Sequence, residues 1–223
     1  MPNYGPKIII DGLVFHIDAQ KSYPLFGTTV KDISKSKING EFGGNVSFQD
    51  GFPSYFDFDG STDYINFGTA PQLDMSTQIS LCAWVWFDSK SSNGHILGKS
   101  NYNNGYIIHY DAAYETRAGG GFQFTNVLGS AWECGVDIDI NKWYYLTYTY
   151  NGFNERFYLN GQVKALRSVT SSVVDTVGKN FYLGYATSDC INGKIATASI
   201  YNRALNSNEV LQNYNALKGR FGL

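Results

Sequence analysis

The stretch GKIATASIYNRALNSNEVLQNYNALKGRFGL, residues 193–223, decides the fold. Small and bulkier residues alternate from Ile195 to Tyr201, which is the pattern of a β-strand. A short polar corner then leads into a segment with helical spacing. Because the remaining chain has the pattern of strands, we expect an all-β protein that closes with one short C-terminal helix.

The expected helix has a start and a stop signal. Asn206 is a suitable N-cap residue, and Glu209 stands at the third helical position, from which its side chain reaches back to the cap. Apolar residues fall on one face at spacings of four and three: Val210, Tyr214 and Leu217. Gly219 is expected to end the helix in the left-handed conformation.

Strand patterns with turn signals between them recur along the whole chain, as in a sandwich or barrel. They are expected at 13–17, 56–58, 65–67, 79–87, 95–99, 106–110, 121–125, 143–150, 155–159, 162–166, 181–185 and 194–201. No helical pattern separates these strands, so parallel crossover units are excluded over most of the chain. The sequence therefore predicts an antiparallel β-sandwich.

Two local patterns refine this expectation. The segment Ile79–Phe87 is apolar on both of its faces, which is typical of a central strand. Asn151-Gly152 and Asn160-Gly161 separate adjacent strand patterns, and this dipeptide is a strong signal for a two-residue hairpin. We expect Trp143–Leu166 to form two consecutive hairpins.

Several sequence motifs are similar to those of a known family. They are GLVFHIDA at 12–19, FDFDGSTDYI at 56–65, ISLCAWVW at 79–86, WYYLTYTYNG at 143–152, FYLNG at 157–161 and the ending YNRAL to RFGL at 201–223. Together they resemble the laminin-G-like, concanavalin A-like jelly-roll domains of tailed-bacteriophage virion proteins. The resemblance covers 12–223 and implies one domain behind an N-terminal arm, 1–11. The segment Val30–Ser36 departs from the family pattern.

Composition limits the classes of partner. The chain has 223 residues, which suits one large sandwich, and 16% of them are charged and 16% aromatic. The formal net charge is -2, so no overall attraction to nucleic acid or to an anionic membrane is expected. The start, Met1–Pro6, lacks the basic and apolar regions of a secretory signal. We expect synthesis in a host cytoplasm and no membrane partner.

Catalytic and disulfide patterns are weak. Cys82, Cys134 and Cys190 are an odd, scattered set that does not imply a disulfide framework. Asp57 and Asp59 alternate on one expected strand, as carboxylates of polysaccharide hydrolases do, but no Glu partner accompanies them. A fold shared with hydrolases does not carry their activity, so we expect no enzyme.

An acidic turn is the candidate metal site. Asp59, Gly60 and Asp63 offer carboxylate and carbonyl oxygens to a hard cation such as calcium. The resemblance also implies a structural calcium, because many related domains hold one. The alternative is that both carboxylates cap the turn by accepting hydrogen bonds from its backbone N–H groups.

Two further sets of residues are candidate contact sites. Asn101, Tyr102 and Trp132 fall in expected loops and offer amides and aromatic rings to a glycan, although ordinary sandwich loops have similar residues. Ile8, Ile9 and Ile10 are too apolar for a free tail. They are expected either to join the sheet of this domain or to dock on a neighbouring protein by strand addition.

The resemblance implies a place on a virus particle. Our leading hypothesis is a non-enzymatic structural protein on the outer surface of a phage virion, a capsid decoration protein whose partners are other virion proteins such as the major capsid protein. The alternative is a carbohydrate-binding host-attachment module of a tail or head fibre, whose partners are host surface glycans.

Overall fold

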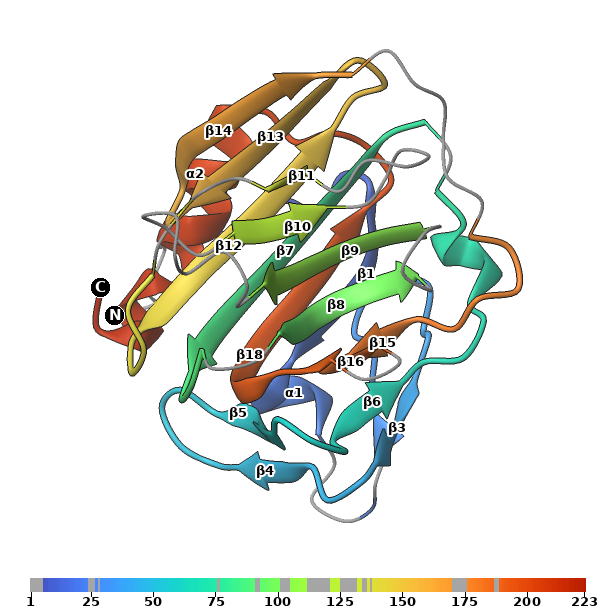
Figure 1. Cartoon of the computed structure of the whole chain (residues 1–223), viewed down its shortest axis with the longest axis vertical. Coiled ribbons are helices and arrows are strands. Elements are labelled where there is room, and N and C mark those ends of the chain that lie inside the picture. The colour runs from blue at the N-terminus through green and yellow to red at the C-terminus, as the bar shows by residue number, and fades with distance from the viewer. Residues whose placement is uncertain are drawn as a thin grey trace.

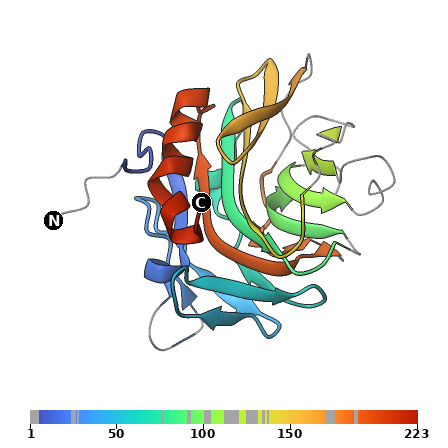
Figure 2. The same ribbon diagram turned by 90° about the vertical axis from the view of Figure 1, so that its left-hand side faces the viewer.

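The architecture is a sandwich of two sheets, seen edge-on in Figure 2. The computed structural model describes residues 6–23, 27, 29–75, 77–90, 93–100, 105–111, 121–124, 132–133, 136, 138–169, 176–186 and 189–223. The strands of the two sheets overlap in Figure 1, and the C-terminal helix lies outside one of them. The predicted antiparallel β-sandwich is confirmed.

Sheet A, the sheet under the C-terminal helix, has antiparallel pairing throughout its described strands. From one edge it contains β14 (Gln162–Ser168), β13 (Asn154–Leu159), β12 (Trp143–Tyr150), β7 (Ile79–Phe87), β18 (Asn192–Tyr201), β5 (Tyr55–Asp59) and β4 (Ser47–Gln49), with β1 (Leu13–Asp18) beside β18. β7 is therefore a central strand, as its two apolar faces predict.

Sheet B forms the other layer. Its order is β11 (Trp132–Glu133), β10 (Gly121–Phe124), β9 (Gly105–Asp111), β8 (Gly94–Ser100), β15 (Tyr182–Leu183), β6 (Tyr64–Asn66), β3 (Gly40–Gly43) and β2 (Thr29–Val30), with β16 (Tyr185–Ala186) and β17 (Asp189–Cys190) near β8. Cys190 lies opposite His95 in a short parallel contact between β17 and β8. The other pairs of this sheet are antiparallel.

The helices are short. Those in the described part of the chain are α1 (Ala19–Ser22), the 3₁₀ turn η1 (Pro71–Leu73), α2 (Ser207–Leu217) and the 3₁₀ turn η3 (Lys218–Phe221). The sequence analysis expected only the C-terminal helix and missed α1. This single turn forms because the Asp18 side chain accepts a hydrogen bond from the Gln20 backbone N–H.

The start of α2 agrees with the prediction, whereas its end does not. Asn206 and Glu209 form the expected capping box, in which each side chain accepts a backbone N–H of the other residue. α2 ends at Leu217, Gly219 lies inside η3, and Gly222 is the residue with left-handed backbone, at φ 72°. The stop signal was therefore assigned three residues too early.

Only one of the two expected hairpins has a two-residue turn. Leu159 pairs with Gln162, and the residues between them have φ 51° and 80°, as a type I′ turn requires. Tyr150 instead pairs with Glu155 across four residues. The Asn151 side chain organises that longer loop by accepting two of its backbone N–H groups.

The main core lies between the two sheets. Aromatic rings meet edge to face within it: Phe15 lies 4.8 Å from Phe67 and 4.9 Å from Phe181, centroid to centroid. These three rings come from β1, from the end of β6 and from the segment before β15, so they join both sheets. The inward alternation predicted for the strands places them there.

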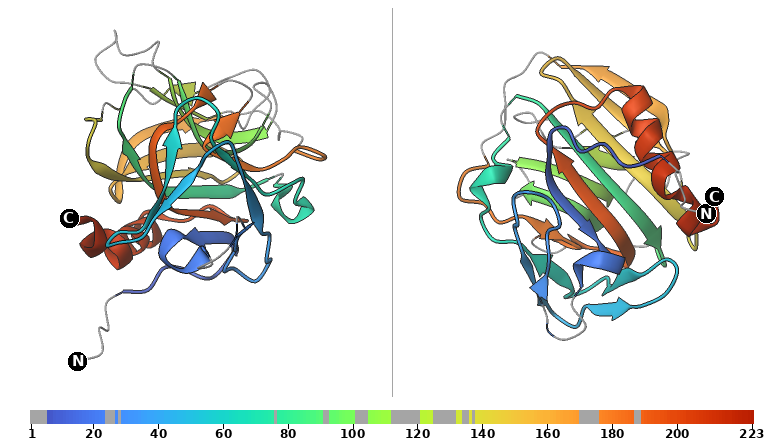
Figure 3. Two further views of the ribbon diagram at one scale, coloured as in Figure 1. Left: turned by 90° about the horizontal axis from the view of Figure 1, so that it is seen from below. Right: turned by 180° about the vertical axis from the view of Figure 1, so that it is seen from behind.

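A second core lies on the outer face of sheet A, under α2 and η3. Trp84 is fully buried there and stacks on Phe221, with ring centroids 3.9 Å apart and planes at 10°. Val210 is also fully buried, while Tyr214 and Leu217 are partly buried against the same cluster. Figure 3, right, shows α2 over the side of the sheet that holds β12 to β14.

The described part of the N-terminal arm docks on α2 and does not join a sheet. The Ile9 N–H donates to Asn213 Oδ1 at 2.7 Å, and the Tyr201 hydroxyl donates to the Ile9 carbonyl at 2.9 Å. Ile10 points away and is 78% exposed. Asn213 is buried at this junction, which makes it a structural residue that helical periodicity did not reveal.

Two other features complete the fold. Cys82 and Cys190 are buried free thiols that form no disulfide, and Cys134 lies outside the described residues. None of the helices in the described part of the chain has the length and apolar content needed to cross a bilayer.

Candidate functional site

The outer face of sheet A is covered at one end and open at the other. Trp84 lies under α2 and η3, whereas Trp86, two residues further along β7 and on the same face, is only partly buried. The covering elements end at Phe221, which contacts both Trp84 and Trp143. The cover therefore stops where the open part of the face begins.

Five strands contribute one residue each to a row across this open face. In register, Trp143 is opposite Trp86, Trp86 is opposite Lys194, Lys194 is opposite Asp57, and Asp57 is opposite Ser47. All five are partly buried. Because residues in register on neighbouring strands share a face, the row passes from aromatic rings to polar groups.

We call Tyr55, Trp86 and Trp143 the aromatic platform. The centroid of Trp143 lies 5.8 Å from that of Trp86 and 5.9 Å from that of Tyr55, with the planes tilted by 59° and 58°. The rings thus form an angled surface. Partly exposed aromatic rings of this kind offer large contact areas to the apolar faces of a ligand.

Lys194 and Asp88 hold the platform in place. Lys194 Nζ lies 4.9 Å from the centre of the Trp86 ring and 5.7 Å from that of Tyr55. The same ammonium pairs with Asp88 Oδ1 at 2.7 Å, and this oxygen also accepts the indole N–H of Trp86 at 2.9 Å. Asp88 therefore fixes both the cation and the indole, which limits the rotamers of Trp86.

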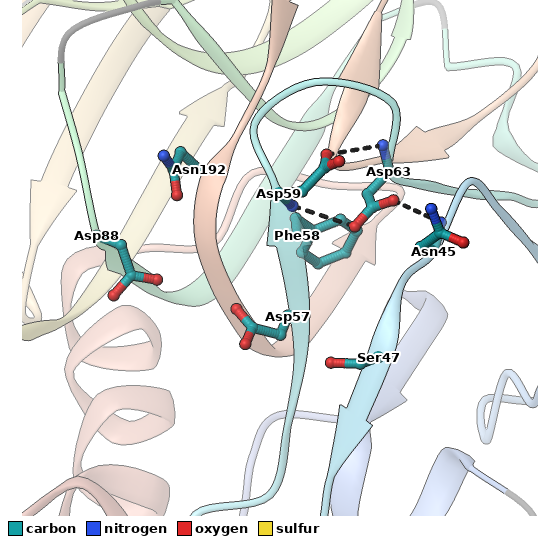
Figure 4. A pocket seen from close by; sticks show the side chains of 8 residues that line it. All are labelled: Asn45, Ser47, Asp57, Phe58, Asp59, Asp63, Asp88 and Asn192. Atoms are coloured by element: carbon teal, nitrogen blue, oxygen red, sulfur yellow. Dashed lines mark hydrogen bonds between the residues drawn. The ribbon is translucent and has the colours of Figure 1, made fainter.

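A cavity of about 330 Å³ adjoins the polar end of the row, and we call it the acidic pocket (Figure 4). It is lined by the carboxylates of Asp57, Asp59, Asp63 and Asp88 and by the amides of Asn45 and Asn192. Burial raises the pKa of the Asp57 carboxyl; Lys194 opposes this shift and Asp88 adds to it. The pocket offers many hydrogen-bond acceptors.

The acidic turn, Asp59–Asp63, forms one wall of this pocket. Asp59 accepts the N–H groups of Ser61 and Thr62 at 2.8 and 2.9 Å. Asp63 is buried and accepts the Asn45 N–H at 2.6 Å. At Gly60, with φ 74°, a Cβ would lie 2.7 Å from Cβ of Asn192, so only glycine fits.

These contacts correspond to the turn-capping alternative. Burial works to raise the pKa of Asp59, but hydrogen bonds from the backbone N–H groups of the turn outweigh it and lower that pKa. Within the part of the chain that the structure describes, no group of three or more His, Cys, Asp or Glu residues is arranged to hold a metal ion. Calcium at Asp59, Gly60 and Asp63 stays a prediction.

The remaining predicted site residues are the glycan and docking candidates. Asn101 and Tyr102 are outside the described residues, and Trp132 lies in β11 at the edge of sheet B. Of the arm, Ile9 is held by α2 of its own chain, whereas Ile10 is exposed. Neither Ile9 nor Ile10 lines the acidic pocket.

The sequence analysis missed the aromatic platform because it searched for exposed aromatic rings in loops. Trp86 was assigned to the covered face of a central strand, and Trp143 was used only to mark a strand. A signal was present, since Trp84, Trp86 and Asp88 alternate on one face and change from apolar to charged. This change marks the point at which the strand leaves its cover.

Comparisons with known proteins identify the family. The sequence profile of the Concanavalin A-like lectin/glucanases superfamily (Laminin_G_3) matches residues 59–211. The chain belongs to this superfamily. The match includes β7, β12 and β18 of the open face and the acidic turn, and it confirms the laminin-G-like, concanavalin A-like part of the resemblance. No curated protein matches the sequence.

Solved structures share the fold at low identity. Domain 4 of AbnA, a GH43 extracellular arabinanase from Geobacillus stearothermophilus, in complex with arabinotriose, has a TM-score of 0.73 and 16% identity, covering 91% of this chain and 98% of that one. The binding domain of Paraclostridial Mosquitocidal Protein 1 has a TM-score of 0.71 and 17% identity, covering 92% and 52%. The binding domain of Botulinum Neurotoxin DC in complex with SialylT has a TM-score of 0.66 and 19% identity, covering 93% and 52%. This chain spans about half of the toxin binding domains.

Proposed function

We propose that this superfamily domain is a non-catalytic, carbohydrate-binding module. The observation that carries the proposal is the aromatic platform at the open end of sheet A, next to a cavity lined by carboxylates and amides. Sugars present apolar C–H faces, which pack on aromatic rings, and hydroxyl groups, which donate to carboxylate and amide oxygens. The site joins both kinds of partner on one rigid sheet.

The comparisons support the same class of ligand. The arabinanase domain is described in complex with arabinotriose, and the neurotoxin binding domain in complex with SialylT. Their identity with this chain is low, so their ligands are a guide to the class of molecule and not to the sugar.

Binding to a glycan array tests this function. The purified domain is expected to bind at least one glycan, and Trp143→Ala is expected to lower that affinity by about tenfold, the effect of losing a central aromatic contact. Phe153→Ala is the matched control, because this ring is 73% exposed in the β12–β13 loop. No binding to any glycan, or equal losses in both variants, would contradict the proposal.

Incubation of the bound glycan with the domain tests the non-catalytic part. We expect no new reducing ends, because a glycosidase needs a positioned pair of catalytic carboxylic acids, whereas Asp59 and Asp63 accept backbone hydrogen bonds and Asp88 is ion-paired. Release of shorter sugars that depends on Asp57 would instead assign hydrolysis to the acidic pocket.

A place on a phage virion is the second part of the proposal. It is supported by the sequence motifs shared with virion jelly-roll domains, above all the ending at 201–223. In this role the domain is displayed on the outer surface, as a capsid decoration protein or as an attachment module, with a shell protein as its partner. Imaging of particles with this protein labelled is the test, and label on the head is the expected result. Absence of label from the particles would contradict the proposed place on the virion.

A further inference from the structure

The row across the open face indicates how a glycan lies there, and this inference rests on the proposed function. Trp143, Trp86, Lys194, Asp57 and Ser47 follow one another on five adjacent strands. Neighbouring strands lie about 4.8 Å apart, so the row spans about 19 Å. One strand spacing is similar to the length of one sugar unit, so the row offers places for about four units in an extended chain.

The two ends of the row differ in chemistry. At the first end, Trp143 and Trp86 present aromatic surface, and Phe221 of η3 packs against Trp143 with ring centroids 5.0 Å apart. At the other end, Asp57 and Ser47 border the acidic pocket. A sugar on the rings is therefore held by its apolar face, whereas a sugar at the pocket is held through its hydroxyl groups.

The charge of the pocket restricts the sugar at that end. Among the described residues that line the pocket there is no Lys or Arg. The ammonium of Lys194, which is opposite Asp57 on the neighbouring strand, is already paired with Asp88 and lies over Trp86. A carboxylate brought by the ligand would thus meet carboxylates without a cation to balance them, which disfavours its charged form.

We infer that the bound glycan is a linear, uncharged oligosaccharide that crosses the strands from Trp143 to Ser47, with acidic sugars excluded at the pocket. The aromatic platform supplies affinity, and the acidic pocket supplies selectivity between neutral and anionic glycans. Asp88 is a positioning residue, because it acts by holding the Trp86 indole and Lys194.

Calorimetry with defined sugars tests both statements. One series of probes consists of neutral arabino-, xylo- and cello-oligosaccharides from disaccharide to hexasaccharide. A second series pairs a neutral sugar with an acidic one: lactose with sialyllactose, and a xylo-oligosaccharide with a glucuronoxylo-oligosaccharide. Affinity is expected to rise with length and to level off at about four units. Each acidic member is expected to bind about tenfold more weakly than its neutral partner.

Variants locate the selectivity. Asp57→Asn is expected to reduce the difference between neutral and acidic sugars, because it removes one carboxylate that borders the bound unit. Glu41→Gln is the matched control, since it makes the same change of charge on β3 of sheet B. Equal binding of acidic and neutral partners, or the same change in both variants, would overturn the charge rule.

A readout on the unchanged protein avoids dependence on folding of the variants. A bound oligosaccharide that covers Trp86 and Trp143 should protect indole fluorescence from acrylamide, and the hexasaccharide should protect more than the disaccharide. Binding without protection would place the glycan elsewhere and overturn the inference while leaving the proposed function intact. If no sugar of the panel binds, the inference is overturned, whereas the proposed function is lost only if the glycan array also shows no binding.

Discussion

Replacing Phe221 by Ala is expected to destabilise the fold more than any other single change in the last turn. The ring is 8% exposed and lies flat on Trp84, with centroids 3.9 Å apart and planes at 10°. Removing a buried Phe side chain costs about 3–5 kcal/mol of unfolding free energy, since neighbouring atoms collapse only in part into the space left behind. For a protein of this size, that loss lowers the melting temperature by about 6–20 °C.

Thermal and urea unfolding of Phe221→Ala measure this loss. Leu223→Ala is the matched control, because Leu223 is 51% exposed and two residues away. The Phe221 variant should also change the near-ultraviolet circular dichroism of the tryptophans, since it removes a partner from both Trp84 and Trp143. A loss below about 1 kcal/mol, or equal losses in both variants, would refute the packing of η3 on sheet A.

Three further predictions concern other parts of the molecule. If the acidic turn holds calcium, chelator should lower the melting temperature and added calcium should raise it, because a ligand that binds the folded state stabilises it by mass action. Identical melting temperatures with chelator and with added calcium would contradict a calcium site at this turn. A hydrogen bond from the Arg203 side chain, helped by one from the Asn206 backbone and by the charge of Arg203, outweighs burial and lowers the pKa of Glu209. This carboxylate therefore stabilises the fold above its ordinary pKa of 4.5, and the contribution is lost as pH falls through the lower folded value. Glu209→Gln should therefore have a lower melting temperature than the wild type at pH 7 and the same melting temperature in strong acid. A difference in melting temperature that persists in strong acid would contradict this dependence on the Glu209 charge. Deleting residues 1–7 should leave a folded domain but reduce its recovery on particles if the arm docks on the shell. If the truncated protein still occupies particles at the normal level, the docking surface lies on the sandwich and not on the arm.

Local patterns predicted the parts of the fold that depend on neighbouring residues. The capping box of Asn206 and Glu209 was found because its partners are three residues apart. The central position of β7 followed from its two apolar faces. The left-handed stop was misplaced at Gly219, because the 3₁₀ turn η3 follows α2 and brings Phe221 onto Trp84. That contact joins residues far apart in sequence.

The candidate site depends on register and coverage, which the sequence does not display. Trp86 and Lys194 are more than 100 residues apart in the chain, and they meet because β7 and β18 pair in one register. Trp84 and Trp86 share one strand and one face, yet only Trp84 is covered by α2 and η3. The amino-acid composition of β7 does not distinguish the covered tryptophan, Trp84, from the partly exposed one, Trp86.

The pairing of β1 with β18 has a consequence for synthesis. β1 (Leu13–Asp18) is hydrogen-bonded to β18 (Asn192–Tyr201), and β18 also joins β7 to β5. Sheet A therefore cannot close while the ribosome still has to add β18, and contacts between such distant segments form slowly. Until then, one edge of β7 has no strand to pair with, so the nascent chain depends on the late arrival of β18 to escape aggregation.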